Sequence, residues 1–246
     1  MGVTVQYLGW ASFLFTDSHG NTLLTDPFLV GDEVKKIPKS PFDAKDIVAD
    51  LIVVSHPARD HFQQGPQILA NSPKTRCLGD HSTLIYIESF GFKDRGELTT
   101  AGAVYEMGDF KITAYDARHV AFARLPDKSL ITGEPLVYII EVSNGPTFFF
   151  GGDTSVTYDM KLWADLHHPD YAIIGIGGVQ FPSGRTLDEM NPVSGAKCAE
   201  LMGVKHVIPM HYWKDDSVDL LKENIARLNL DCDVIPMQYG EVLHLT

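Results

Sequence analysis

Residues 53–62 read Val-Val-Ser-His-Pro-Ala-Arg-Asp-His-Phe and follow directly on Leu51-Ile52. A short apolar run that ends in a small polar residue is typical of a buried strand that leads into a loop. This loop carries three good metal ligands, His56, Asp60 and His61. They are therefore expected at the carboxyl end of a strand, where open sheets usually place their chemistry. The alternative is a loop with two histidines and a capping aspartate that share no role.

The same arrangement recurs three times further along the chain. His119 follows the strand-like run 110–115, Asp153 follows the run 147–150 and two glycines, and His211 follows the run 206–210. Four strand-like runs that each lead to a histidine or an aspartate are hard to obtain by chance. The repetition favours one shared metal site over four unrelated loops.

These residues resemble the signature of the metallo-β-lactamase superfamily, which is His-x-His-x-Asp-His followed by a distant His, an Asp and a last His. The resemblance covers nearly the whole chain. Within the superfamily, the sequence looks like the branch that contains the ascorbate-6-phosphate lactonases and many uncharacterised metal-dependent hydrolases. The stretches that carry this second likeness are Val5–Phe13, Leu24–Phe28, Gly151–Thr154 and Ile208–Tyr212. The resemblance implies an α/β (α+β) fold, a four-layer αββα sandwich.

The sequence departs from the family pattern at two positions. Ala58 stands where the pattern has its second histidine, and Trp10 stands where this branch often has a histidine. Carried over residue by residue, the second metal site is complete, with Asp60, His61, Asp153 and His211. The first site keeps only His56, His119 and the shared Asp153. The resemblance therefore implies one firmly held metal and a weakened or absent partner, that is, one or two ions per chain.

Two further residues are candidates for supporting roles around the metal. His81 could supply the missing nitrogen from another loop, although a position at the start of a helix beside the capping Asp80 is the favoured alternative. Asp26, in the pair Asp26-Pro27, resembles a motif near the site in this branch. Asp26 is expected to orient a ligand rather than to bind the metal.

The predicted chemistry is hydrolysis. A divalent metal with an open position lowers the pKa of bound water from about 15.7 to about 7. Asp60, as a ligand, and Asp153, as a bridging or water-orienting carboxylate, are the expected catalytic residues. The mixture of nitrogen and carboxylate ligands suits zinc first, and also manganese or iron.

The substrate is expected to be a small molecule, with an anionic group as one option. Four basic residues lie in or beside the relevant loops and could bind a carboxylate or phosphate: Arg59, Arg118, Arg185 and Lys214. For any one of them alone, a solvated surface charge is the favoured explanation, though less so for all four together. The segment Val120–Glu134 follows His119 and is expected to be a long loop, either a lid or a contact between copies in a homo-oligomer. Tyr212 and Trp213 either wall the pocket or pack in the core.

Composition limits the other classes. A chain of 246 residues with 44% hydrophobic content can bury a large core as a single domain, 1–246. The net charge of −12 argues against a nucleic-acid partner. The distant Cys77, Cys198 and Cys232 are interpreted as buried thiols. No apolar run reaches the membrane-spanning length of about 20 residues, and no signal-peptide pattern opens the sequence, so a cytoplasmic location is expected.

Three functions follow from these patterns. The favoured one is a metal-dependent hydrolase of a small cytosolic ester, lactone or phosphoester. The second is a degenerate member that binds metal or ligand without catalysis, suggested by Ala58 and Trp10. The third is a phosphodiesterase of the nuclease type, which the acidic charge disfavours.

The expected elements alternate in two halves, each beginning with strands and ending in helix–strand units. Strands are predicted at 3–7, 12–16, 22–25, 51–54, 75–78, 103–107, 110–117, 136–142, 147–150, 171–174, 206–209, 233–235 and 241–245. Helices are predicted near 64–70, 82–90, 156–165, 192–202 and 216–228.

Overall fold

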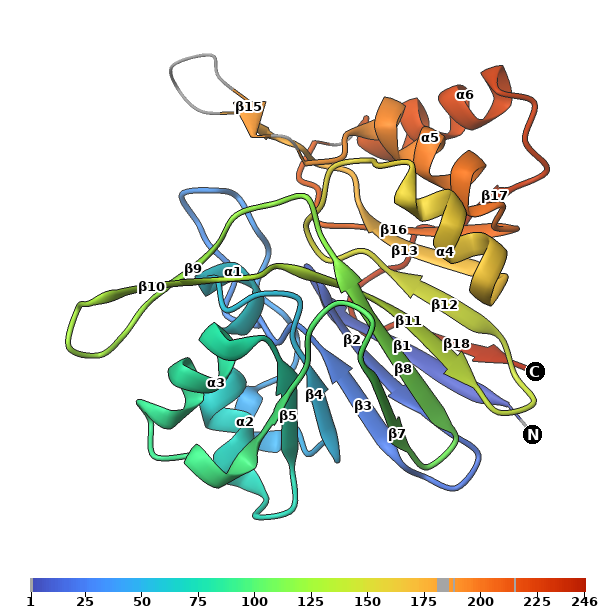
Figure 1. Cartoon of the computed structure of the whole chain (residues 1–246). Coiled ribbons are helices and arrows are strands. Elements are labelled where there is room, and N and C mark those ends of the chain that lie inside the picture. Colours follow the sequence, from blue (N-terminus) through green and yellow to red (C-terminus); the bar gives the residue numbers. More distant parts are fainter. Residues whose placement is uncertain (1, 181–185, 188, 215) are drawn as a thin grey trace.

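The computed structural model describes residues 2–180, 186–187, 189–214 and 216–246. Two seven-stranded sheets form its centre (Figure 1). The first sheet has the strand order β18 (Val242–Leu245), β1 (Val3–Gly9), β2 (Ser12–Thr16), β3 (Thr22–Thr25), β4 (Leu51–Val53), β5 (Arg76–Gly79) and β6 (Gly96–Leu98). The second has the order β17 (Asp233–Val234), β16 (His206–Met210), β13 (Tyr171–Gly175), β12 (Thr147–Phe150), β11 (Leu136–Val142), β8 (Phe110–Asp116) and β7 (Val104–Met107).

Helices lie on the outer faces of both sheets. The helices and single 3-10 turns that belong to the first half are α1 (Arg59–Phe62), α2 (Gly65–Asn71), α3 (His81–Glu88), η1 (Ala44–Asp46) and η2 (Lys93–Arg95). Those of the second half are α4 (Asp159–His167), α5 (Pro192–Met202) and α6 (Ser217–Arg227). Two small antiparallel strand pairs complete the described elements: β9 (Ala121–Arg124) with β10 (Leu130–Gly133), and β14 (Val179–Gln180) with β15 (Thr186–Leu187).

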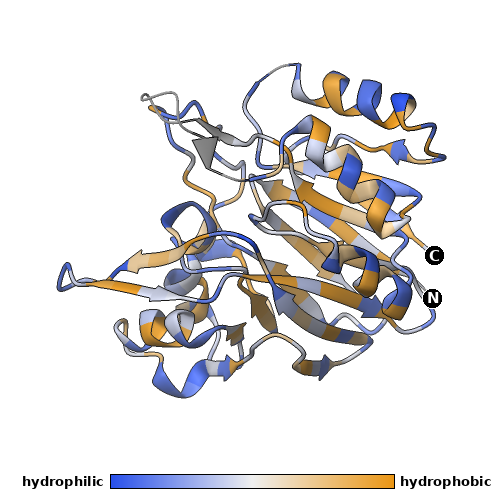
Figure 2. Ribbon diagram, turned by 45° about the horizontal axis from the view of Figure 1, so that its top comes forward, coloured by the Kyte–Doolittle hydropathy of each residue, from blue (hydrophilic) through white to orange (hydrophobic). Residues whose placement is uncertain are grey.

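Three apolar layers hold this arrangement together. The layer between the sheets is rich in buried aromatic side chains, among them Phe13, Phe15, Phe148 and Phe150. A second layer joins the first sheet to α2 and α3, and a third joins the second sheet to α4, α5 and α6. The strands are accordingly the most apolar parts of the ribbon, while the outer helices alternate in hydropathy (Figure 2). The predicted four-layer αββα sandwich is confirmed.

The strands that carry the predicted ligands all end at one edge of the sandwich. In the first sheet, β3, β4 and β5 run parallel. In the second sheet, β12, β13 and β16 run parallel, and β8 has the same direction because β11 is antiparallel to both β8 and β12. The loops after β4, β8, β12 and β16 therefore meet at the carboxyl ends of their strands, as the sequence predicted.

The predicted elements match the observed ones closely. The bounds of β2, β3, β11, β12 and α5 are those expected, and Asn191 caps α5 with a reciprocal capping box. Among the described residues, no helix is long and apolar enough to cross a membrane. All three cysteines are free; Cys77 and Cys198 are buried, whereas Cys232 is only half-buried.

The structure corrects the prediction of a long loop at Val120–Glu134. This segment is a β-hairpin formed by β9 and β10, which projects from the sandwich (Figure 1). Side chains of β9 alternate between buried and exposed, but the buried positions are Ala121 and Ala123 and the exposed ones include Phe122. The hydrophobic alternation that reveals a strand is thus inverted, which explains why the sequence pattern did not show it.

Candidate metal centre

A buried polar network holds His61 in place through its Nδ1 atom. His61 lies on α1, and its Nδ1 is 2.8 Å from Asp26 Oδ2. Asp26 also accepts hydrogen bonds from the Ser55 backbone N–H at 2.7 Å and from the Ser55 hydroxyl at 2.5 Å. Asp26 is completely buried, so this network has no competition from water. The bond to Asp26 favours the proton on Nδ1 and leaves Nε2 free to bind a metal, the orienting arrangement expected for Asp26.

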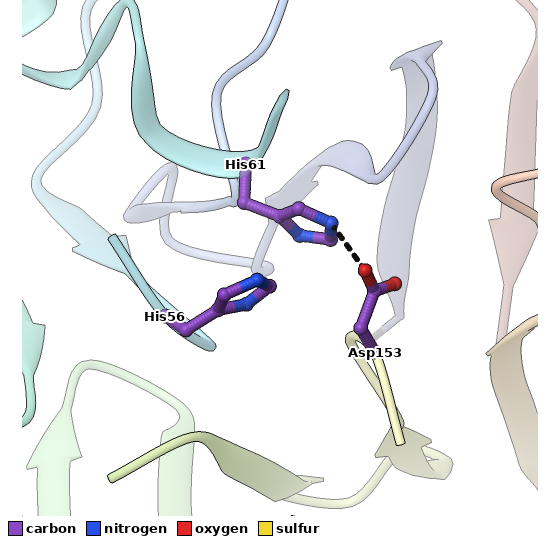
Figure 3. Close-up of side chains that lie close together, drawn as sticks. All are labelled: His56, His61 and Asp153. Carbon is purple, nitrogen blue, oxygen red and sulfur yellow. Dashed lines mark ion pairs between the residues drawn. The ribbon is translucent and has the colours of Figure 1, made fainter. Parts of the chain in front are cut away.

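Asp153 reaches the same point from the opposite sheet. Gly152, just before it, has φ +50°, and a Cβ there would lie 2.5 Å from the Ser55 Cβ. Only glycine allows both this backbone conformation and this close approach. Figure 3 shows His56 and His61, which follow β4 of the first sheet, and Asp153, which follows β12 of the second, turned toward a common space. Each offers a ligand atom, and these atoms all lie within 4.8 Å of one another.

The geometry around Asp153 fits a divalent metal. Asp153 Oδ2 lies 3.0 Å from His61 Nε2 and 3.4 Å from His211 Nε2. Both imidazole nitrogens are nevertheless buried, and neither has a hydrogen-bond partner of acceptable geometry among the described residues. Two ligands that share a tetrahedral zinc at about 2.1 Å are about 3.4 Å apart without bonding to each other. A shared cation would satisfy these buried atoms, which proteins seldom leave unpaired.

His211 is placed by an uncommon backbone conformation and by Trp10. Its φ is +51°, in the left-handed region that non-glycine residues seldom occupy outside functional sites. Its N–H donates to the Trp10 carbonyl at 3.3 Å, and its carbonyl accepts from the Gly177 N–H at 3.0 Å. The Trp10 and His211 rings lie 4.1 Å apart between centroids. Trp10, where the branch often has histidine, therefore packs against a candidate ligand.

Burial and mutual charge set the ionisation of the cluster. Burial lowers the pKa of His56 well below its usual value, and lowers those of His119 and His211. Burial also opposes a charge on His61, but Asp153 and Asp26 outweigh it and raise its pKa well above the ordinary value. Burial likewise opposes the charge of Asp153, yet His211 and His61 hold its pKa well below the usual range.

Asp60 lies in the same cavity but takes a different partner. Its Oδ2 is 3.2 Å from Lys35 Nζ. Burial disfavours its charge, but His61, His211 and Lys35 outweigh burial and lower its pKa to about 2. Within the part of the chain that the structure describes, its carboxylate is not one of the clustered ligand atoms. Its role as a metal ligand stays a prediction.

The basic residues that were predicted to bind an anionic substrate group differ in whether they line the cavity. Arg59 pairs with Asp32 at 2.8 Å and Arg118 with Asp159 at 3.3 Å, and neither lines the cavity. Both are the solvated surface charges that were the alternative reading. Arg185 lies outside the described residues. Lys214 does line the cavity.

The structure corrects the suggestion that His81 supplies the missing nitrogen ligand. His81 is exposed at the first position of α3 and does not line the cavity. The carboxylate of Asp80 caps this helix by accepting from the backbone N–H groups of Ser82 and Thr83. The helix-start alternative is therefore the correct one, because the helix directs His81 toward solvent.

Several of the candidate ligands line a cavity of about 820 Å³. One part of its wall is apolar, and another carries the predicted Lys214 together with Lys35 and Lys36, which the sequence did not indicate. Its lining consists of Val34, Lys35, Lys36, His56, Ala58, Asp60, His119, Val120, Phe122, Asp153, Glu189, His211, Trp213 and Lys214. Trp213 thus walls the cavity, whereas Tyr212 packs against the core beneath the outer helices.

Glu189 is the residue that sequence reasoning missed. Its Oε1 lies 3.8 Å from His119 Nε2, and its side chain is only 7% exposed. Burial, and then the charge of Asp153, raise its pKa to about 8. The available signal was an acidic residue just before the capped helix α5, between two ligand-bearing strands. Such a position also suits many ordinary surface carboxylates.

Known proteins resemble this chain in both fold and sequence. The metallo hydrolase Igni18 from Ignicoccus hospitalis superimposes with a TM-score of 0.77 at 21% identity, covering 99% of this chain and 98% of that one. The metallo-beta-lactamase fold protein YhfI from Bacillus subtilis gives a TM-score of 0.71 at 16% identity, covering 99% and 100%. These likenesses establish the metallo-β-lactamase fold.

Sequence comparison gives the family. Residues 4–211 match the beta-lactamase superfamily domain. A UPF0173 metal-dependent hydrolase of Rubrobacter xylanophilus is 30% identical over 248 residues, which cover 98% of this chain and 96% of that protein. The chain belongs to the UPF0173 metal-dependent hydrolase family of the beta-lactamase superfamily.

Metal should stabilise the fold measurably. Because the ligand cluster exists only in the folded chain, metal at about 100 times its Kd should add about 2.7 kcal/mol, or about 5–10 °C in Tm. The metal must displace the proton that Asp153 and Asp26 favour on His61. The increase in Tm should therefore be smaller at about pH 6 than at about pH 8. Thermal melts of chelator-treated protein, with and without added Zn²⁺ or Mn²⁺, test this; equal Tm values would contradict it.

Proposed function

We propose that the protein hydrolyses a small cytosolic ester, lactone or phosphoester that carries an anionic group. One observation carries this proposal: buried imidazole nitrogens and a carboxylate face one point at the floor of a cavity large enough for a small molecule. The ligand atoms suit zinc first, and manganese or iron as well. The acidic chain and the modest cavity favour a small substrate over a nucleic acid.

The mechanism divides the work among the residues of the cluster. When bound, a divalent metal would make a water molecule acidic enough to supply a nucleophile near neutral pH. His61 and His211, with Asp60 as a predicted ligand, would hold the metal of the second site, and His56 and His119 would hold a metal in the first. Asp26 keeps His61 in the required tautomer. Asp153, charged at neutral pH, would both bind the metal and orient the attacking water by accepting its proton in a hydrogen bond.

The cavity wall supports an amphipathic substrate. Val34, Val120, Phe122 and Trp213 form an apolar surface on which an acyl or alkyl group could pack. Lys36 and Lys214 lie on the same cavity and could bind a carboxylate or phosphate, whereas Lys35 is already paired with Asp60. Phe122 of β9 and Val120, which lies between the candidate ligand His119 and β9, both contribute to this wall. These contacts support a role for the hairpin in substrate specificity.

A substrate panel tests the proposal. Metal-loaded protein is assayed against lactones, carboxylic esters, thioesters, phosphomonoesters and phosphodiesters, each in an anionic and a neutral version. Metal-dependent turnover that prefers the anionic versions is the expected result. Absence of turnover on every class, by protein that carries its metal, would instead favour the degenerate member that binds without catalysis. Turnover confined to polynucleotides would favour the nuclease type.

Replacing Lys214 should change substrate binding selectively. Lys214→Ala is expected to raise KM for an anionic substrate about 10-fold, because one charge-assisted contact is lost, and to leave KM for its neutral analogue unchanged. The matched control is Lys74→Ala, at an exposed position that does not line the cavity. Equal KM changes for both substrates would remove Lys214 from substrate recognition.

A further inference from the structure

The first metal site lacks one protein ligand where the family has a histidine. The family pattern leaves this site His56, His119 and Asp153. The rings of His56 and His119 lie 5.1 Å apart between centroids, and each histidine offers a ligand atom within 4.8 Å of one from Asp153. Ala58 contributes only a methyl group to the cavity wall. It also begins α1, the helix that carries His61, with φ −61° and ψ 153°. The gap is therefore in the ligand set and not in the backbone, which still places its neighbours around the cavity.

Glu189 lines the same cavity as Ala58 but comes from another part of the chain. Its carboxylate, His119 and Asp153 offer three ligand atoms that all lie within 4.8 Å of one another. Glu189 Oε1 is 3.8 Å from His119 Nε2, and Asp153 Oδ2 is also 3.8 Å from that nitrogen. These equal separations are close to the spacing of about 3.4 Å for two atoms that share a tetrahedral metal.

The backbone holds Glu189 at this place. The N–H of Met190, the next residue, donates to the carbonyl of Thr154, which itself follows Asp153, at 3.0 Å. Two residues after Glu189, Asn191 begins α5 with its capping box. Glu189 is thus fixed relative to Asp153 on one side and to a helix start on the other. Its position is built into the fold.

The surroundings of Glu189 call for a cation. Its side chain is 7% exposed, and no hydrogen bond to its carboxylate comes from the residues that the structure describes. Among the described residues, the basic groups within 4.0 Å of this carboxylate are the imidazoles of His119, at 3.8 Å, and of His211, whose Nδ1 lies at 4.0 Å. Lys35 also acts on Glu189 through its charge. The negative charge of Asp153 beside it further disfavours an unpaired charge on Glu189. A buried carboxylate is costly unless it is paired or coordinates a metal.

We propose that Glu189 replaces the missing histidine as a ligand of the first metal site, together with His56, His119 and Asp153. The chain then holds two metal ions, although Ala58 removes one histidine of the usual set. The first site has two nitrogens and two carboxylate oxygens. Its higher oxygen content makes it more suitable for manganese or iron than a site built from three histidines. The inference concerns metal binding, so it stands whether or not the proposed substrate class is correct.

Metal stoichiometry tests the assignment without an activity assay. Unsubstituted protein, Glu189→Gln and Glu189→Ala are stripped, titrated with Zn²⁺ or Mn²⁺, and analysed for bound metal by mass spectrometry and calorimetry. The unsubstituted protein is expected to bind two equivalents. Both variants are expected to lose the weaker equivalent, with its Kd raised about 100-fold or more, since even losing a residue that merely orients a ligand costs 10- to 100-fold. Glu106→Gln, an exposed glutamate on β7, is the matched control.

A second substitution makes the test specific to the missing histidine. Adding Ala58→His to Glu189→Ala places an imidazole on the same cavity, and we expect the second equivalent to return. Co²⁺ provides an independent reading, because its visible absorption reports the ligands of each equivalent. Equal Tm values of the metal-free forms establish that all variants are folded. A single equivalent in the unsubstituted protein, or two undiminished equivalents in both Glu189 variants, would overturn the proposal.

Discussion

Replacing Asp153 with asparagine should lower the hydrolytic rate about 100-fold or more while the fold survives. Asp153 Oδ2 lies within 3.0–3.8 Å of three histidine nitrogens, those of His61, His211 and His119. No other described carboxylate oxygen belongs to both ligand clusters around the cavity. The amide has nearly the same shape but carries no charge, so it weakens the metal site and the orientation of the attacking water together.

The measurement requires a substrate on which the unsubstituted protein turns over in a metal-dependent way. Both forms are compared at matched metal loading and with similar Tm of the metal-free state. Asp165→Asn, an exposed aspartate on α4, is the control for the change from carboxylate to amide. Near-full activity of Asp153→Asn at matched loading would remove Asp153 from the mechanism and strengthen the reading of the chain as a binder without catalysis.

The sequence predicted the ligand edge well because buried strands and the residues after them form local patterns. The run 51–54 is apolar throughout, as expected of a strand covered on both faces, and His56 follows it within two residues. The same holds for Phe148–Phe150 before Asp153 and for Val207–Met210 before His211. Parallel strand directions then bring these loops to one edge.

What the sequence did not predict depends on contacts between distant segments. Glu189 belongs to no local ligand pattern, and the hydrogen bond from the Met190 N–H to the Thr154 carbonyl holds it beside Asp153. Lys35 and Lys36 reach the cavity from the irregular segment before β4. Strand β9 was not predicted for another reason. Its small alanines point inward and Phe122 points outward, so the usual hydrophobic alternation is reversed. Local periodicity cannot reveal either arrangement.

Substitutions at His61 and at Asp26, which orients it, should weaken metal binding to different degrees. His61→Ala should remove a ligand and weaken metal binding by about 100-fold or more, while Asp26→Asn should weaken it by about 10- to 100-fold. The reason is that His61 Nδ1 is bonded to Asp26 at 2.8 Å, so Asp26 fixes the tautomer but leaves the metal-binding nitrogen in place. Calorimetric titration of stripped protein with Zn²⁺ measures both effects.

His81→Ala is the control for this series, since His81 is an exposed histidine on α3 outside the cavity. It should leave metal affinity unchanged. The order of the three variants is the informative result, because general destabilisation would follow burial and would affect Asp26 as strongly as His61, both being fully buried. A smaller loss for Asp26→Asn than for His61→Ala, at equal Tm of the metal-free forms, places Asp26 behind the ligand. Unchanged affinity in His61→Ala would show that the metal is held elsewhere, and the assignment of His61 and Asp153 as a shared site would be wrong.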